Sequence, residues 1–170
     1  ENLQSVENQI QENIEKKVNQ NYLYNKTEVA ENILPLFSKN GAISITAFTN
    51  KIIKNEIIKK NNLEFYVGFS YQEDLMFMIN VLANASSFYY LPETFYEYYP
   101  LSTGLYSSYR KDGGVKFIEA RKRINGLIEK YQIKNIDENH LNESFLYNVT
   151  WFVYRTNGRV KDKKEKKSLI

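Results

Sequence analysis

The spacing of apolar residues along this chain predicts a fold made mostly of helices, with only a few short strands. Apolar side chains recur three and four residues apart, which places them on one face of a helix. This spacing marks five stretches, within residues 2–20, 27–39, 73–82, 115–131 and 139–158. Strand-like composition is confined to residues 43–48, 88–91 and 94–98, with a further extended stretch at 63–67. The sequence therefore predicts an α+β fold that is mainly helical.

Residues that favour helix ends give approximate bounds for some of these segments. Thr27 is a suitable N-cap for the second helix, because its side chain can accept a hydrogen bond from an unpaired backbone N–H. A short basic helix is expected over residues 54–60. Asp137 or Asn139 is expected to cap the last helix, and Gly158 to end it.

Composition excludes several classes of site. The 170 residues include no Cys, which rules out disulfides, thiolate metal sites and a cysteine nucleophile. The single His140 cannot build a histidine metal cluster, and it is expected to be a surface or capping residue. Much of the net charge of +3 lies in the Lys-rich end of the chain, so we expect no nucleic-acid partner. A weak nucleic-acid binder, the alternative argued from Lys and Tyr content, would show a steep salt dependence.

Four groups of residues between Ile43 and Ser108 follow one another in a distinctive order. An Asn50-Lys51 pair leads into the basic helix, and a stretch ending in Phe65 follows it. A Glu73-Asp74 pair then stands at a helix start, and the Tyr-rich stretch 89–98 comes after that helix. In this order and spacing the chain resembles the second, acceptor-side half of bacterial family 2 glycosyltransferases, which have the GT-A type fold. The match covers the middle of the chain and is weaker on either side.

The resemblance implies the inverting transfer of a sugar from a nucleotide-sugar donor to a glycan or lipid-linked acceptor. A carboxylate must then take the proton of the acceptor hydroxyl as the new bond forms. By resemblance Asp74 is that general base, and Glu73 orients the acceptor or Asp74 itself. The helix start is expected to keep Asp74 ionised and to weaken its basicity. The alternative is that both acids only stabilise the first turn of their helix.

Six further residues are implied as contacts of the substrates. Asn50 and Lys51 either touch the acceptor or form a structural hydrogen bond under the Glu73-Asp74 loop. The others lie just before that acidic pair or in the loop after the Tyr-rich stretch: Tyr71, Tyr99, Ser102 and Arg110. Tyr99 stands where many relatives place an arginine, so Arg110 or Lys111 would supply the cation that contacts the donor diphosphate.

Two parts of such an enzyme have no counterpart in these residues. No Asp-x-Asp occurs, the motif with which the family holds a divalent metal, Mg²⁺ or Mn²⁺, and the donor diphosphate. A polar helix stands where the nucleotide-binding βαβ half is expected. We therefore expect a fragment with no cofactor of its own, which binds a nucleotide sugar only together with the missing half and is inactive alone.

The chain divides into four expected parts: a polar amphipathic helix at 1–21, an acceptor-side half at 22–112, a helical pair at 113–158 and a basic tail at 159–170. Exposed strand edges recruit other chains, so the first helix and the strand at 43–48 predict a homo-oligomer. The tail predicts a cytoplasmic protein that can contact an anionic membrane surface. The alternative function is a non-catalytic interaction or oligomerisation module that keeps this scaffold.

Overall fold

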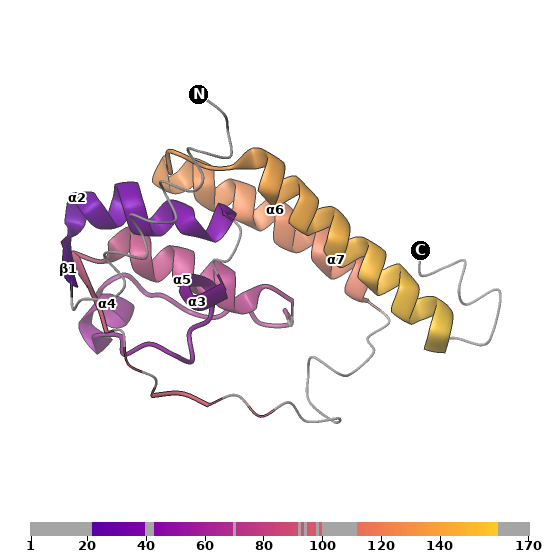
Figure 1. The fold of residues 1–170 in the computed structure, drawn as a ribbon, viewed down its shortest axis with the longest axis horizontal. Helices are drawn as coiled ribbons and strands as arrows, with labels where there is room; N and C mark the ends of the chain where they lie inside the picture. Colours follow the sequence, from indigo (N-terminus) through magenta and orange to yellow (C-terminus); the bar gives the residue numbers. More distant parts are fainter. Residues whose placement is uncertain are drawn as a thin grey trace.

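The computed structural model describes residues 22–39, 43–69, 71–91, 93, 95–97, 99 and 112–159. Within them the fold is mainly helical with one two-stranded antiparallel sheet, which confirms the coarse α+β prediction (Figure 1). The predicted helix at 2–20 and residues 160–170 of the tail lie outside the described residues. The elements in chain order are β1 (Tyr22–Asn25), α2 (Lys26–Glu28), the π-helical η1 (Val29–Ile33), the 3₁₀ helix η2 (Leu34–Ser38), α3 (Ile43–Thr46), α4 (Asn55–Lys60), α5 (Glu73–Asn84), β2 (Ser87–Tyr90), α6 (Gly113–Tyr131) and α7 (Glu138–Arg159).

The helical segment formed by α2, η1 and η2 is capped by Asn25, so the predicted Thr27 cap is wrong. The Asn25 side chain accepts a hydrogen bond from the Glu28 N–H at 3.1 Å, and the Glu28 carboxylate accepts one from the Asn25 N–H at 2.9 Å. This reciprocal arrangement is a capping box, which needs an acid three residues after the cap. Glu28 meets that requirement for Asn25, whereas Thr27 falls inside the first turn.

The sheet pairs β1 with β2, in register from Tyr22 opposite Tyr90 to Asn25 opposite Ser87. The strand predicted at 88–91 is thus confirmed with a shift of one residue, but its partner β1 was not predicted. Two other predicted strands are wrong. Residues 43–46 form the helical turn α3, which packs on α5 and η2, and the described residues 95–97 have no regular structure.

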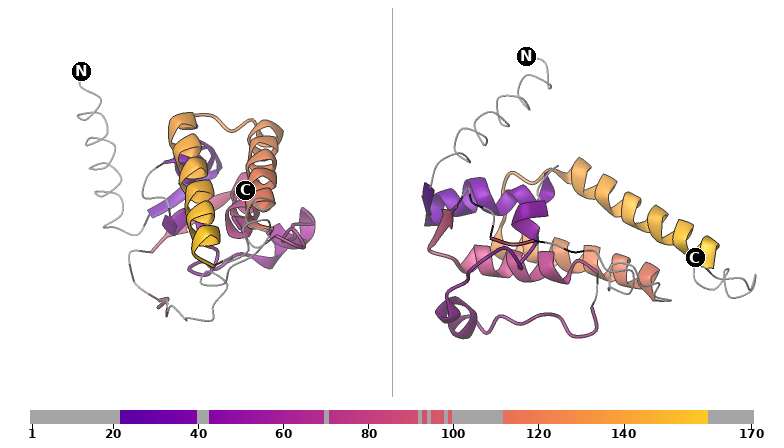
Figure 2. Two further views of the ribbon diagram at one scale, coloured as in Figure 1. Left: turned by 90° about the vertical axis from the view of Figure 1, so that its right-hand side faces the viewer. Right: turned by 60° about the horizontal axis from the view of Figure 1, so that its bottom comes forward.

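Helix α5 is the centre of the hydrophobic core. Every residue from Leu75 to Leu82 is buried, because α5 contacts α3, α4 and α6 as well as η1 and η2. Burial on all sides is typical of a helix enclosed by its neighbours. Helix α6 contacts both α5 and α7, and Figure 2 shows α6 and α7 side by side. None of the described helices is long and apolar enough to cross a membrane.

A polar contact joins α5 to α6 inside this core. The Tyr131 hydroxyl donates a hydrogen bond to the side-chain oxygen of buried Asn80 at 2.8 Å and accepts one from the Asn84 amide at 3.2 Å. The Asn80 amide donates in turn to the Met76 carbonyl at 2.8 Å. Because buried polar groups must be paired, this small network fixes the register of α6 on α5.

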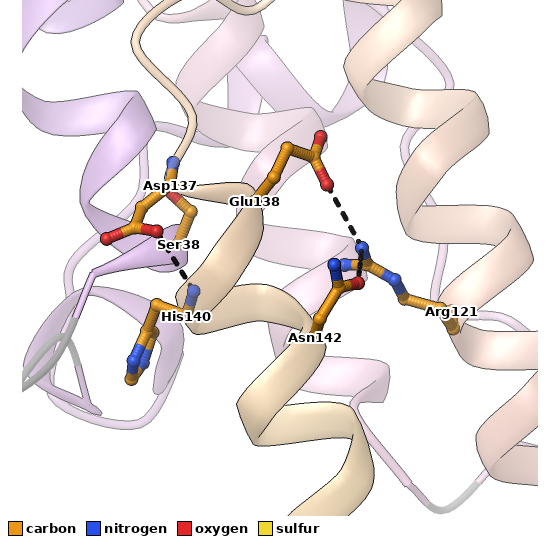
Figure 3. A network of polar contacts seen from close by, with 6 residues as sticks. All are labelled: Ser38, Arg121, Asp137, Glu138, His140 and Asn142. Atoms are coloured by element: carbon orange, nitrogen blue, oxygen red, sulfur yellow. Dashed lines mark hydrogen bonds and ion pairs between the residues drawn. The ribbon is translucent and has the colours of Figure 1, made fainter.

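The start of α7 is held in place by polar contacts from two other elements (Figure 3). The buried Ser38 hydroxyl accepts a hydrogen bond from the Asp137 N–H at 3.0 Å. The Asp137 carboxylate accepts one from the His140 N–H at 2.9 Å, so Asp137, one of the two expected caps, is the N-cap. His140 is a half-buried first-turn residue that is capped, not a surface or capping residue as predicted. From α6, the Arg121 guanidinium bonds to Glu138 at 3.2 Å and to Asn142 at 2.9 Å. Helices α6 and α7 are therefore fixed relative to each other.

Candidate active site

Asp74 lies in the first turn of α5, at the end of this helix opposite to the sheet. Gln72 precedes the helix in a left-handed conformation (φ 59°), which costs free energy in a non-glycine residue. The Met76 N–H donates to the Gln72 carbonyl at 3.0 Å, so the first turn closes directly after Gln72. Because the following residues are buried, the half-buried side chains of Glu73 and Asp74 occupy a fixed place at the edge of the core.

The carboxyl group of Asp74 binds its proton more tightly than an ordinary aspartate. Its pKa is raised from 3.8 to about 6, chiefly by burial and also by the adjacent charge of Glu73, with the charge of Lys51 acting in the opposite direction. The expectation that the helix start weakens the basicity of Asp74 is therefore wrong, because removal of the carboxylate from water has the larger effect. At pH 7 the group remains mostly ionised, yet it is a stronger base than a solvated aspartate.

Lys51 is the cation that interacts with Asp74. The pKa of Lys51 is lowered from 10.5 to about 8 by burial, although the charge of Asp74 acts in the opposite direction. The Lys51 ammonium donates hydrogen bonds to the Ala47 carbonyl and, at 2.7 Å, to the side-chain oxygen of Asn50. These hydrogen bonds lie within residues 47–51 and do not reach Glu73 or Asp74, so both roles proposed for Asn50 and Lys51 stay predictions.

A cluster of three phenylalanine rings attaches the Lys51 loop to α5. The rings of Phe48 and Phe65 lie 5.2 Å apart, and those of Phe65 and Phe77 are stacked at 4.1 Å with an angle of 11° between their planes. Phe77 belongs to α5, and Phe48 precedes Lys51 by three residues. The three rings therefore connect the segment that carries Lys51 to the helix that carries Asp74. Aromatic pairs of this kind add about 0.5–1.5 kcal/mol beyond the area they bury.

Tyr71 lies where the loop before Asp74 meets α6. Its ring is 4.4 Å from that of Phe117, and its hydroxyl is 3.1 Å from the point where a side chain on Gly113 would begin. Phe152 of α7 approaches the same point at 2.5 Å, so only glycine fits there. Tyr71 is thus half-buried against α6, and its contact with a substrate stays a prediction. The Gly113-Gly114 pair at the expected helix start was a signal of this close approach.

The remaining predicted site residues are not joined to Asp74 by any described contact. Tyr99 is exposed, and its hydroxyl donates to the Glu97 carboxylate, a bond that raises the pKa of Tyr99. Ser102 and Arg110 lie outside the described residues. The Tyr-rich strand β2 follows the far end of α5, and a helix of this length separates it from Asp74 by about 18 Å.

The described residues offer no comparable group elsewhere. They contain no group of three or more His, Asp or Glu side chains that could hold a metal ion. A shallow hollow of about 260 Å³ runs along α7, and none of the predicted site residues lines it. Its lining residues all belong to α7: His140, Glu143, Ser144, Tyr147 and Asn148. The group around Asp74 is therefore the best candidate for chemistry.

The electrostatic contact between Lys51 and Asp74 makes a direct prediction. Because the charge of Lys51 lowers the pKa of Asp74, the substitution Lys51→Met should raise that pKa above about 6. Carbon-detected NMR titration of the Asp74 carboxyl group measures this in the chain as it stands. Lys54→Met is the matched control, since Lys54 is an exposed lysine three residues further on. Equal shifts in the two variants would show that Lys51 has no special relation to Asp74.

Comparisons of this chain with protein-family models, with curated proteins and with solved structures find no match. The assignment of a function therefore rests on the geometry around Asp74 and on the resemblance of the sequence motifs. Both point to the same pair of carboxylates at the start of α5, Glu73 and Asp74.

Proposed function

We propose that this chain is the acceptor-side part of an inverting glycosyltransferase and that Asp74 is its general base. One observation carries the proposal: a half-buried carboxylate whose pKa is about 6 stands at a fixed helix start next to a lysine. Strongly shifted pKa values with a specific charge partner are typical of catalytic groups, although ion pairs of purely structural importance show them too. The GT-A type fold of the parent enzyme is part of the same proposal.

The reaction requires one proton to move as one bond forms and another breaks. The acceptor hydroxyl oxygen attacks the anomeric carbon of the donor sugar, and the bond from that carbon to the nucleoside diphosphate breaks. The Asp74 carboxylate takes the hydroxyl proton, and the diphosphate leaves with the electron pair. A base with a pKa near the working pH suits this step, because it is ionised and still binds the proton well.

Lys51 and Glu73 have opposite effects on this base. Glu73 raises the proton affinity of Asp74, and Lys51 lowers it, which favours the ionised carboxylate. Lys51 is itself fixed by Asn50 and the Ala47 carbonyl, so its charge stays close to Asp74. In this proposal Glu73 orients the acceptor, and Tyr71 holds the loop that carries both acids against α6.

The proposal is tested by joining this chain to the donor-binding half with which it would act. We expect transfer from a nucleotide sugar to occur only in the joined protein and to depend on Asp74. A joined protein that folds and binds donor but transfers equally well without the Asp74 carboxylate would contradict the proposal. Its acceptor, a glycan or a lipid-linked sugar, is found by varying the acceptor in the same assay.

A separate prediction concerns these 170 residues alone. They should bind neither UDP-sugars nor GDP-sugars, because they contain no Asp-x-Asp to hold a metal and the donor diphosphate. Isothermal titration calorimetry with and without Mg²⁺ or Mn²⁺ measures this directly. Micromolar, metal-dependent binding to the isolated chain would overturn the assignment of the donor site to a missing half.

The second candidate function is an interaction module, and exposed apolar side chains on the two long helices favour it. Val115 and Ile118 of α6 are 61% and 49% exposed, and Leu146 and Tyr154 of α7 are 61% and 78% exposed. Clusters of exposed apolar residues often mark contact surfaces.

We therefore expect a homo-oligomer. Sedimentation of a clean monomer at high concentration would contradict this, and Leu146→Lys should dissociate the oligomer if α7 forms the contact.

A further inference from the structure

Two cations of α6 lie on the aromatic rings of the loop that leads to Asp74. The Arg123 guanidinium is 4.8 Å from the ring centre of Tyr66 and 4.9 Å from that of Phe69. The Lys116 ammonium lies 4.8 Å from the same Phe69 ring. Lys116 and Arg123 are seven residues apart, so both project from one face of α6. The two rings are 6.2 Å apart in an edge-to-face arrangement, and together they support both cations.

The two cations differ in what already neutralises them. Lys116 forms an ion pair with Glu119 at 3.1 Å. Among the described residues, by contrast, no hydrogen bond or ion pair engages the exposed guanidinium of Arg123. Contact with an aromatic ring uses the flat face of a guanidinium and leaves its N–H donors at the edge available. Arg121, two residues earlier, differs, because Glu138 and Asn142 both bond to its Nη2 nitrogen.

An arginine held against two aromatic rings, with no hydrogen bond to its donors among the described residues, is able to bind phosphate oxygens. The planar edge offers two parallel N–H groups to two oxygens of one phosphate, and a neighbouring ammonium adds charge. Lys116 and Arg123 carry two positive charges against the one negative charge of Glu119, so an excess of positive charge remains at these rings. A neutral sugar would use neither the charge nor the two parallel N–H donors.

We propose that Arg123 and Lys116, supported by Tyr66 and Phe69, form a binding site for a phosphate or diphosphate group. The site lies on the segment that enters α5, since Phe69 precedes Asp74 by five residues and Lys116 adjoins Phe117, on which Tyr71 packs. The biological role of this site rests on the proposed function. In an acceptor-side half of a glycosyltransferase, a diphosphate site indicates an acceptor whose sugar is carried on a lipid diphosphate. The binding itself is independent of any transfer reaction.

The test is a titration of the whole chain with inorganic pyrophosphate, followed by NMR of the backbone amides and of the Arg123 side-chain N–H. We expect the largest shifts at Arg123, Lys116 and Phe69. Arg123→Leu should weaken binding by about tenfold or more, because charged hydrogen bonds are lost. Arg123→Lys keeps the charge without the planar edge, so it should recover only part of the affinity.

Two control variants separate a built site from general positive charge. Lys122→Met removes the same charge from the adjacent residue, which has no described ring contact, and should change pyrophosphate affinity less than about twofold. Lys130→Met removes a cation that lies 4.6 Å from the Tyr131 ring, and it should leave affinity unchanged as well. Losses in either control equal to that in Arg123→Leu, or the absence of shifts at Arg123, would overturn the proposal. Circular dichroism of each variant establishes that it is folded.

Vesicle binding distinguishes a diphosphate group carried on a lipid from one carried on a soluble molecule. Phosphatidylcholine vesicles that contain a polyprenyl diphosphate should bind the chain more tightly than vesicles of equal charge made with phosphatidylglycerol. Pyrophosphate binding without this preference supports the same site for a soluble diphosphate. Binding that depends on vesicle charge alone contradicts it. Asp74→Asn should leave pyrophosphate affinity intact, so failure of the transfer proposal and failure of this one give different results.

Discussion

Asp74→Asn is expected to lower turnover by about 10²–10⁴ in a protein that joins this chain to its donor-binding half, which corresponds to roughly 3–5 kcal/mol in the barrier. The amide keeps the shape of the carboxylate but cannot accept the acceptor proton. Donor affinity should be nearly unchanged, because the proposal assigns donor binding to the other half. Steady-state kinetics with both substrates varied, together with a binding measurement for the donor, checks the prediction.

Glu73→Gln is the matched control, since it removes the same charge from the adjacent residue. It should reduce turnover less than Asp74→Asn and change mainly the acceptor KM, as its proposed role is to orient the acceptor. It should also lower the pKa of Asp74, because Glu73 raises that pKa in the native chain. The acidic limb of the pH–rate profile should then move below about 6. Nearly full activity in both variants, with only a small loss of stability, would mean that the acids merely stabilise the start of α5.

Folding should tolerate both substitutions. A single acidic side chain in the first turn contributes about 0.3–1 kcal/mol through the helix dipole. The helix dipole favours the ionised form of Asp74, whereas the burial that raises its pKa favours the protonated form. The folded chain therefore holds the neutral carboxyl group more readily than the unfolded chain does. The contribution of Asp74 to stability therefore falls as pH rises from about 4 to about 6. Melting temperatures of Asp74→Asn should lack this part of the pH dependence.

Long helices with a continuous apolar face were predictable from the sequence, whereas short elements were not. The helical spacing at 115–131 matches α6, and the apolar residues 75–82 are the buried part of α5. The strand predicted at 43–48 was wrong because so short a stretch shows no reliable apolar period. Contact with α5 and η2 decides the helical conformation of residues 43–46. Strand β1 was missed because its first residues gain structure only by pairing with β2, which is distant in sequence.

The acidic pair of the candidate site was predictable, but its electrostatic surroundings were not. Glu73 and Asp74 were placed in the first turn by their position before an apolar run, and the structure agrees. The raised pKa of Asp74 depends on burial and on Lys51, which lies more than 20 residues earlier in the chain. Spacing along the sequence cannot reveal such a contact. The position of Arg123 on Tyr66 and Phe69 is of the same kind, since it requires α6 to lie beside the loop.

Gly113→Ala is expected to destabilise the chain by about 1–3 kcal/mol, which corresponds to a fall in melting temperature of roughly 2–12 °C. An alanine Cβ at this position would lie 2.5 Å and 2.7 Å from two ring atoms of Phe152. The ring is buried and packs on Phe117, so it cannot rotate away without moving its neighbours. The same Cβ would lie 3.1 Å from the Tyr71 hydroxyl, so the loop that carries Asp74 should shift too.

Gly126→Ala is the control that fixes the sign of this effect. Gly126 also lies in α6, but nothing approaches its missing Cβ within 4 Å. Alanine there should stabilise the chain by about 0.5–1 kcal/mol, since it restricts the unfolded state and favours helix.

In the Gly113→Ala background, Phe152→Leu should cost less than it does alone, because the smaller side chain leaves room for the new Cβ. If Gly113→Ala instead stabilised the chain as Gly126→Ala does, the close contact between the start of α6, Tyr71 and α7 would not exist. NMR titration of Asp74 completes the test: its pKa should change in Gly113→Ala, where Tyr71 is displaced, and stay at about 6 in Gly126→Ala.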